Sequence, residues 1–422
     1  MCSVKKGTNM KRLTVVATIC CALTAPVVAQ DAEPHGMPAV DAALKPLVES
    51  GQLPGLAVVV LKDGKRVHEL VAGKRNLASG APVELNTLFH IYSMTKPVTA
   101  VAMMVLYEQG KWKPEDPISK ILPEFKNVKV FKGLDAAGKP ILEQPKTPPT
   151  IAQLMTHTAG FTRGTPLSSY VDQLYKGILS GATSPKDWTK RLASLPLAYE
   201  PGTQWRYSVS MDVEGRIIER VSSMSLPDFM RKYIFQPLKM NDTGFYVPPE
   251  KAERLSKIYY GTKAGLVEVP SILGSALKPP VIPSGGGGLV STAGDYARFA
   301  QMLLNDGELE GVRVLKPGSV QAIMTSHIAP EIVNGGFGVG LQWIRPGYEY
   351  GYSGVVVTDP ALAKVNLGKG SYLWDGAAGS WFWVDPENRI VFVGMIQRYI
   401  APGFPPVEQI SQKAVMESMK TD

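Results

Sequence analysis

Segments with the pattern of β-strands lie near both ends of this 422-residue chain, with a mostly helical stretch between them, and this arrangement constrains the fold most. Residues 55–61 and 66–71 are rich in β-branched and aliphatic side chains and flank an Asp-Gly turn, which predicts a β-hairpin. Residues 381–384 and 390–396 predict a second hairpin close to the C-terminus. Strands so far apart in sequence fit one sheet if the middle of the chain is an insertion.

Other parts of the chain carry apolar residues at helical spacing. Pro46 predicts a kink or an early end of the first helix, and Gly110 predicts the end of the second. The proline- and lysine-rich residues 112–150 predict little regular structure. The predicted helices cover residues 39–49, 98–108, 151–155, 211–221, 294–304 and 406–419.

Together these segments predict an α/β (α+β) fold, with an antiparallel sheet flanked by helices and an inserted, mostly helical domain. The sheet domain is expected to be discontinuous and to comprise residues 30–115 and 285–422. The inserted domain is expected to comprise residues 116–284. We expect one functional site at the seam between the two.

The first 29 residues have the layout of a secretory signal peptide. A basic segment precedes the apolar residues 13–25, which are too few to span a bilayer, and residues 27–29 form a cleavage site. The alternatives are a buried N-terminal helix and, more weakly, a lipoprotein anchored through Cys20 or Cys21. Cleavage near Ala29 predicts an exported protein that is periplasmic or secreted.

Cleavage also changes what the composition implies. It removes four of the 45 basic residues and none of the 37 acidic ones, so the net charge falls from +8 to +4. All three cysteines lie in the removed segment, which excludes thiol nucleophiles, thiolate metal sites and disulfides. The histidines form no close metal-ligand pair, and no basic run is interleaved with aromatic residues. We therefore expect no metal, cofactor, nucleic-acid partner or stable membrane insertion, and the oligomeric state stays open.

Ser93 and Lys96 form a Ser-x-x-Lys motif just ahead of the predicted helix 98–108. Residues three apart on a helix share a face, so Lys96 can reach the Ser93 hydroxyl and help to remove its proton. The motif is short. It also occurs at Ser3 in the signal segment and at Ser275, where two prolines block a following helix. The alternative for Ser93 is an ordinary helix cap.

Tyr207 is the candidate proton acceptor, because it follows a Pro-Gly turn and precedes the predicted helix 211–221. A phenol is a poor base unless nearby cations favour its anion, and Lys96 can supply that field. The alternative is a core-packing tyrosine. The chain has no Gly-x-Ser-x-Gly elbow and no Walker motif, so glycines 285–288 predict a tight loop with close backbone approach rather than a phosphate cradle.

With these motifs, the chain resembles the serine β-lactamase-like superfamily, which includes class C β-lactamases, DD-peptidases and family VIII carboxylesterases. The resemblance extends over nearly all of the mature chain and rests on several separated motifs in the expected order. It implies the fold of that superfamily. The motifs are Ser93-Met94-Thr95-Lys96, residues 154–160, Tyr207-Ser208, residues 285–291 and residues 292–296.

Two departures favour the carboxylesterase branch, to which the resemblance is closest. Class C β-lactamases carry Tyr-x-Asn and Lys-Thr-Gly, whereas Tyr207 is followed by Ser-Val and this chain has no Lys-Thr-Gly. At the corresponding place, Trp374-Asp375-Gly376 resembles the Trp-Gly-Gly element of family VIII carboxylesterases, with an aspartate in the middle. In the family that lysine attracts a substrate carboxylate, whereas Trp374 offers an apolar wall. The resemblance therefore implies neutral esters rather than anionic β-lactams.

The resemblance also implies a role for each site residue. Ser93 attacks the ester carbonyl, while Lys96 and Tyr207 carry its proton. The tyrosine then protonates the leaving alcohol and helps to activate water. The backbone N–H groups of Ser93 and Ala377 form an oxyanion hole, each worth about 3 kcal/mol. The implied substrate-binding residues are Trp374, Asp375 and Gly376.

We therefore expect a serine carboxylesterase that hydrolyses short-chain esters through an acyl-enzyme on Ser93, with weak β-lactam hydrolysis as a side activity. A β-lactamase or DD-peptidase is the enzymatic alternative, and a non-catalytic binding protein on the same scaffold is the alternative of another class. The intact Ser93, Lys96 and Tyr207 argue against a binding protein, which has no need for all three. His157 is expected to hold a turn, without a catalytic role.

Overall fold

The computed structural model describes residues 36–164, 169–178, 181–339 and 342–420. The predicted signal segment lies outside these ranges. The described residues all belong to one compact unit, and the predicted division into a discontinuous and an inserted domain stays a prediction. None of the helices in the described ranges is long and apolar enough to cross a membrane.

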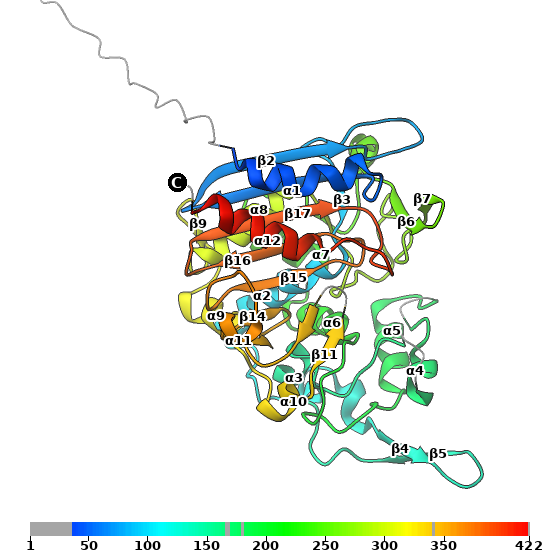
Figure 1. The fold of residues 1–422 in the computed structure, drawn as a ribbon. Helices are drawn as coiled ribbons and strands as arrows, with labels where there is room; N and C mark the ends of the chain where they lie inside the picture. Colours follow the sequence, from blue (N-terminus) through cyan, green and yellow to red (C-terminus); the bar gives the residue numbers. More distant parts are fainter. Residues whose placement is uncertain (1–35, 165–168, 179–180, 340–341, 421–422) are drawn as a thin grey trace, which may run out of the picture. The chain divides into compact units, whose positions relative to one another are not determined.

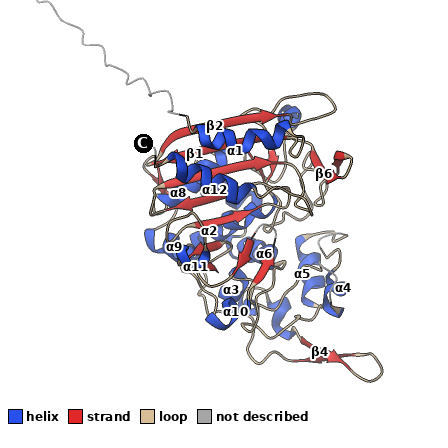
Figure 2. Ribbon diagram, viewed as in Figure 1, coloured by secondary structure: helices blue, strands red, loops and turns tan. Residues whose placement is uncertain are grey.

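A seven-stranded antiparallel sheet joins the two ends of the chain, as predicted (Figures 1 and 2). Its strand order is β13-β14-β15-β16-β17-β1-β2, and Val59 of β1 lies opposite Val393 of β17 where the N-terminal and C-terminal strands pair. The two predicted hairpins are therefore neighbours in one sheet. The strands of this sheet are β1 (Gly55–Lys62), β2 (Lys65–Gly73), β13 (Tyr348–Tyr350), β14 (Val355–Val357), β15 (Tyr372–Asp375), β16 (Trp381–Asp385) and β17 (Ile390–Ile396).

The turn between β1 and β2 is tight for a local reason. Asp63 and Gly64 both have positive φ angles, 52° and 78°, and this pair of conformations matches the twist of a two-residue hairpin. Within the described residues, ten further strands pair two by two outside the main sheet. They are β3 (Phe89–His90), β4 (Val130–Leu134), β5 (Pro140–Glu143), β6 (Ile258–Thr262), β7 (Gly265–Val269), β8 (Val290–Ser291), β9 (Glu308–Leu309), β10 (Val312–Arg313), β11 (Phe337–Val339) and β12 (Gln342–Ile344).

Helices cover both faces of the sheet, with α1 and α12 on one side and α8 on the other (Figure 1). Successive side chains of a strand point to opposite faces. Accordingly, Trp381 Nε1 donates to Ser411 Oγ of α12 at 3.1 Å, whereas the Phe382 ring lies 4.9 Å from that of Tyr296 on α8. Burial on both faces explains why β1, β16 and β17 read as continuous apolar runs.

Within the described ranges, the six predicted helices are present to within three residues at either end, and six further helices were not individually predicted. Helix α1 runs through Pro46, because burial of its Val40 and Leu44 outweighs the backbone hydrogen bond that proline cannot donate. Helix α2 begins three residues earlier than predicted, since Pro97 fits the first turn, where its N–H would have no partner. Residues 112–150 contain the hairpin β4–β5. The helices are α1 (Pro38–Glu49), α2 (Thr95–Glu108), α3 (Ile151–Met155), α4 (Tyr170–Tyr175), α5 (Pro185–Ala193), α6 (Ser210–Ser222), α7 (Leu226–Met230), α8 (Ala293–Leu304), α9 (Pro317–Ile323), α10 (Pro330–Gly335), α11 (Pro360–Ala363) and α12 (Val407–Ser418).

Candidate active site

Ser93 lies in a short 3-10 turn, Tyr92–Met94, that leads directly into α2. The preceding Tyr92 has a φ of 42°, a left-handed conformation that is strained for a bulky side chain. Two contacts fix the Tyr92 side chain: its hydroxyl donates to Ser271 Oγ at 3.0 Å and lies 2.8 Å from the Tyr399 hydroxyl. Strained backbone persists where its surroundings fix it, so the turn holds Ser93 in a defined position.

The structure brings Ser93, Lys96 and Tyr207 together. Lys96 Nζ donates to Ser93 Oγ at 3.2 Å, and Tyr207 OH donates to the same oxygen at 2.5 Å. Lys96 is 3% exposed, and its Nζ lies 4.6 Å from the centre of the Tyr207 ring. Two groups that can exchange a proton therefore contact one half-buried serine oxygen.

Tyr207 lies three residues before α6, and α6 packs against α2. The side chain of His157 packs against Tyr207. The His157 ring lies 4.8 Å from the Tyr207 ring, and its Nδ1 lies 2.9 Å from Ser208 Oγ. Complete burial, and to a lesser degree the charges of Lys96 and Arg163, hold the pKa of His157 well below its usual value. The ring is therefore neutral, and with a φ of 59° this residue occupies a turn, in agreement with the structural role predicted for it.

Asp212 fixes the loop that holds Lys96, a contribution that the sequence did not reveal. Its carboxylate accepts from Ser284 Oγ at 2.5 Å and from the backbone N–H of Gly286 at 3.1 Å. The carbonyl of Gly286 in turn accepts from Lys96 Nζ. In sequence Asp212 resembles the acidic residues that commonly stabilise the first turn of a helix, so nothing marked it as part of the site.

The glycine run forms the tight loop that the sequence predicted. A Cβ on Gly285 would overlap the backbone carbonyl of Met211, so this position excludes a side chain. Thr99 of α2 also donates to the Gly285 carbonyl at 2.7 Å. The loop therefore lies close against both α2 and α6, which confirms the prediction of close backbone approach.

The turn between β15 and β16 reaches the serine from the sheet side. A Cβ on Gly376 would stand 2.5 Å from the carbonyl oxygen of Ile91, so only glycine allows this turn to approach the Ser93 segment so closely. The next residue, Ala377, borders the same pocket as Ser93. Because Ser93 and Ala377 border one pocket, their backbone N–H groups can be close enough to form the predicted oxyanion hole, which stays a prediction.

Trp374 and Asp375 were predicted to bind substrate, but both are buried behind the residues that line the pocket. Trp374 is 1% exposed and stacks on Tyr207, with ring centres 6.0 Å apart, so it supports the tyrosine from behind. Asp375 is also buried and accepts from Gln342 Nε2 at 3.5 Å. Neither residue, nor Gly376, borders the described pocket around Ser93. The reason is that β15 lies inside the sheet, where both faces are covered.

The pocket around Ser93 has a volume of about 150 Å³. Ile272 and Leu273, which are 60% and 42% exposed, contribute apolar surface to it, a contribution that the sequence analysis assigned to Trp374. Arg163 also borders it, with its guanidinium carbon 5.4 Å from the centre of the Tyr207 ring. Sequence reasoning missed these three residues, because each comes from a segment without a recognisable motif.

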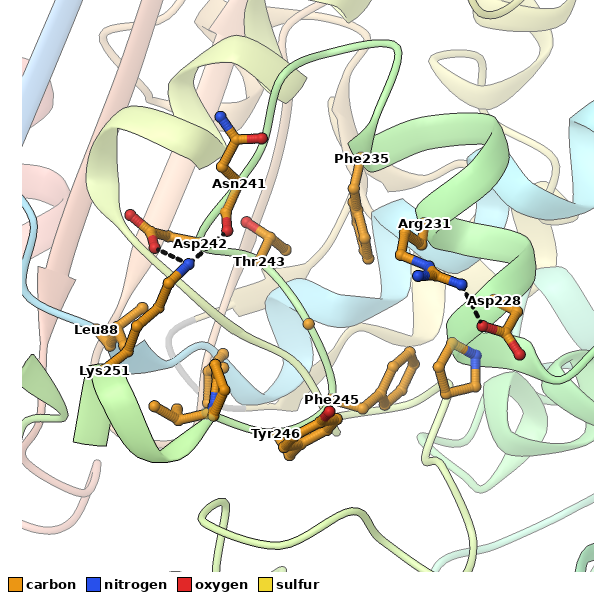
Figure 3. Close-up of a pocket in the computed structure, with 15 residues that line it drawn as sticks. Leu88, Asp228, Arg231, Phe235, Asn241, Asp242, Thr243, Phe245, Tyr246 and Lys251 are labelled. Carbon is orange, nitrogen blue, oxygen red and sulfur yellow. Dashed lines mark hydrogen bonds and ion pairs between the residues drawn. The ribbon is translucent and has the colours of Figure 1, made fainter.

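A larger pocket of about 340 Å³ lies between α7, the residues that follow it and the loop 241–248 (Figure 3). Its charged side chains are already paired, with Lys251 donating to Asp242 at 2.8 Å and Arg231 donating to Asp228 at 2.7 Å (Figure 3). No serine or histidine lines it. Within the described ranges, no group of three or more His, Cys, Asp or Glu side chains is placed to hold a metal ion. Among the described residues, Ser93 with Lys96 and Tyr207 remains the candidate catalytic group.

Sequence comparisons place this architecture among known proteins. The sequence model of the family described as Beta-lactamase matches residues 40–409. Protein Rv1367c of Mycobacterium tuberculosis is 34% identical over 360 residues, which cover 84% of this chain and 88% of the relative. Esterase EstB of Burkholderia gladioli is 29% identical and the match covers 81% and 86%. Lovastatin esterase of Penicillium rubens is also 29% identical, and the match covers 85% and 92%.

Solved structures share the fold. EstCE1, described as a hydrolase with promiscuous acyltransferase activity, superposes with a TM-score of 0.75 at 24% identity, covering 90% of this chain and 98% of that one. Unliganded simvastatin synthase from Aspergillus terreus superposes with a TM-score of 0.79 at 21% identity, covering 93% and 100%. At these identities the likeness shows the fold alone.

Proposed function

The chain belongs to the beta-lactamase family and is a serine hydrolase of the esterase type, and we propose that it hydrolyses short-chain carboxylic esters through an acyl-enzyme on Ser93. The observation that carries this proposal is the convergence of Lys96 Nζ and Tyr207 OH on Ser93 Oγ, at 3.2 and 2.5 Å. Two relatives are named as esterases, which supports an ester substrate.

In the acylation step, Ser93 Oγ attacks the ester carbonyl and its proton passes to the Tyr207 oxygen. Lys96 Nζ lies 4.6 Å from the centre of the Tyr207 ring, so its positive charge is next to the group that accepts this proton. Negative charge on the carbonyl oxygen is met by backbone N–H groups at Ser93 and Ala377. Tyr207 then gives the proton to the departing alcohol oxygen, and the acyl group stays on Ser93.

In the deacylation step, water takes the place of the alcohol. Tyr207 accepts a proton from the water as it attacks the acyl carbonyl, and Ser93 Oγ leaves and is reprotonated. The Gly286 carbonyl keeps Lys96 Nζ beside Ser93 in both half-reactions. A pocket of about 150 Å³ is smaller than sites for drug-sized ligands, which supports short acyl chains.

Weak β-lactam hydrolysis belongs to the same proposal. The nucleophile and both proton-carrying groups can open a β-lactam ring as they open an ester. The late strand, however, carries the buried Trp374 and Asp375 where the resemblance places the lysine of class C β-lactamases, so this strand offers no cation to a β-lactam carboxylate. We therefore place esters ahead of cephalosporins.

A substrate panel with a serine variant tests this proposal. We expect wild-type enzyme to hydrolyse 4-nitrophenyl acetate and butyrate with higher kcat/KM than the octanoate ester or a chromogenic cephalosporin. Ser93→Ala should lose this hydrolysis and the acyl adduct with a serine-reactive phosphonate. Ser275→Ala is the matched control, because Ser275 begins the other Ser-x-x-Lys sequence of the mature chain but is exposed and lies outside the pocket. Activity retained in Ser93→Ala, or a cephalosporin preferred over every ester, would overturn the proposal.

A further inference from the structure

Arg163 brings a second positive charge to the pocket that contains Ser93. Its guanidinium carbon lies 5.4 Å from the centre of the Tyr207 ring, on a side chain that is exposed to solvent. Lys96, the other cation of the pocket, is buried and bound to Ser93 Oγ and the Gly286 carbonyl. The two cations therefore differ, since Lys96 is committed to the nucleophile whereas Arg163 faces the space that a substrate enters.

The donors of Arg163 are not used by an acidic side chain. No carboxylate of the described residues forms an ion pair with it, in contrast to Arg206, which pairs with Asp172 at 2.5 Å. The carboxylate of the pocket, Asp212, is already bound by Ser284 and Gly286. A guanidinium presents a planar fork of N–H donors that matches a carboxylate in two parallel hydrogen bonds. This fork is available to an anionic group of the substrate.

The position of Arg163 indicates which part of the ester carries that group. In the mechanism proposed above, Tyr207 protonates the leaving alcohol, so the side of the pocket next to Tyr207 holds the alcohol part. Leu273 borders the pocket beside the glycine loop, with its Cδ1 3.3 Å from the position that a Cβ of Gly287 would take. Apolar surface there suits the acyl chain. The charge on Arg163 is thus next to the leaving group and not next to the acyl chain.

We propose that this enzyme selects esters whose alcohol part carries a carboxylate, and that Arg163 is the residue that binds it. This inference rests on the proposed esterase function. The absence of Lys-Thr-Gly from the late strand argues against anionic substrates. Arg163 nevertheless brings a cation to the same pocket from the segment that follows α3, and so adds anionic esters as a substrate class.

The test compares two acetyl esters that differ in charge on the leaving group, 4-acetoxybenzoate and 4-acetoxybenzamide. For wild-type enzyme we expect a higher kcat/KM for the benzoate. In Arg163→Gln the ratio of the two values should fall about tenfold, which is the usual loss for one charge-assisted contact. Arg163→Lys should retain part of the ratio, and 0.5 M NaCl should reduce it in wild-type enzyme. Arg231→Gln, which removes an exposed arginine outside this pocket, is the matched control and should keep the ratio.

Several outcomes would overturn the inference. If the benzoate-to-benzamide ratio of kcat/KM is unchanged in Arg163→Gln, the guanidinium does not bind the carboxylate of the leaving group. An equal loss for both esters with a shifted pH–rate profile shows that Arg163 acts on the Tyr207 phenolate instead. A preference for mono-4-nitrophenyl succinate over 4-nitrophenyl butyrate that depends on Arg163 places the anion on the acyl side. If wild-type enzyme hydrolyses no ester, the proposed function itself fails, which distinguishes the two cases.

Discussion

The hydroxyl of Tyr207 lies 2.5 Å from the Oγ of Ser93, although 114 residues separate them in the sequence. This contact exists because α6 packs against α2 and places the residues just before each helix side by side. Lys96 Nζ donates to the same oxygen at 3.2 Å, so the proposed transfer of the serine proton needs no histidine. The predictions below test the parts of this arrangement one at a time.

Removing the Tyr207 hydroxyl should stop proton transfer while leaving the ring packing in place. We expect Tyr207→Phe to lower kcat for 4-nitrophenyl butyrate by about 10²–10⁴-fold, the usual size of general acid–base catalysis. Steady-state kinetics and thermal unfolding measure the two effects. Tyr350→Phe is the matched control, because the buried Tyr350 hydroxyl has no hydrogen-bond partner among the described residues and its removal should cost little. A kcat for Tyr207→Phe near the wild-type value would exclude Tyr207 as the proton carrier.

Gly376 should tolerate no side chain. Its Cβ would stand 2.5 Å from the Ile91 carbonyl, so Gly376→Ala must move the turn that carries Ala377 away from Ser93. We expect kcat to fall by about 10²-fold, as for the loss of one oxyanion donor, together with a lower Tm. Gly318→Ala in α9 is the control, because nothing lies within 4 Å of its Cβ position. Full activity in Gly376→Ala would show that this turn does not serve the oxyanion.

Asp212 should act on catalysis through the glycine loop. Asp212→Ala removes the acceptor of both Ser284 Oγ and the Gly286 N–H, which frees the carbonyl that holds Lys96. We expect kcat to fall by about tenfold or more, since hydrogen bonds to a charged group are each worth about 1.5–3 kcal/mol. Ser284→Ala, which keeps the bond to Gly286, should lose less. The reverse order of these two effects would contradict this positioning role.

Glu408 should make stability fall as the pH rises. It is buried on α12 and accepts from Gln342 Nε2 at 2.8 Å. Burial, followed by the charge of Asp375, raises the pKa of Glu408 to about 8 from a usual 4.5. Between these pH values the folded state binds one more proton than the unfolded state, so the stabilisation present below pH 4.5 is lost as the pH approaches 8.

Urea unfolding of wild-type and Glu408→Gln proteins at pH 5.5 and pH 8 measures this effect. The free energy of unfolding should drop more between the two pH values in the wild type than in Glu408→Gln, which cannot ionise. Glu417→Gln changes an exposed carboxylate of the same helix and should behave like the wild type. Equal pH slopes for wild type and Glu408→Gln would show that the carboxyl is already ionised at pH 5.5.

Local sequence signals predicted those parts of the fold that local forces decide. The Asp63-Gly64 turn and the runs of β-branched and aliphatic side chains predicted the hairpins, and helical spacing predicted six of the helices, including the five longest, to within three residues. Pro46 misled, because packing of α1 against the core outweighs the missing hydrogen bond. The hairpin β4–β5 was missed, because a run of prolines and lysines gives no apolar alternation to read.

The site divides in the same way. Ser93 and Lys96 are three residues apart on one turn, so the sequence by itself determined that they could meet. The Pro-Gly turn and the following helix marked Tyr207 as a candidate partner, and the resemblance to a known family supported this choice. Only the tertiary structure decided that Asp212 anchors the glycine loop, that Trp374 stands behind Tyr207, and that Arg163 faces the pocket. Spacing along a helix fixes neighbours within a turn or two, whereas contacts between distant segments depend on how whole helices and strands pack.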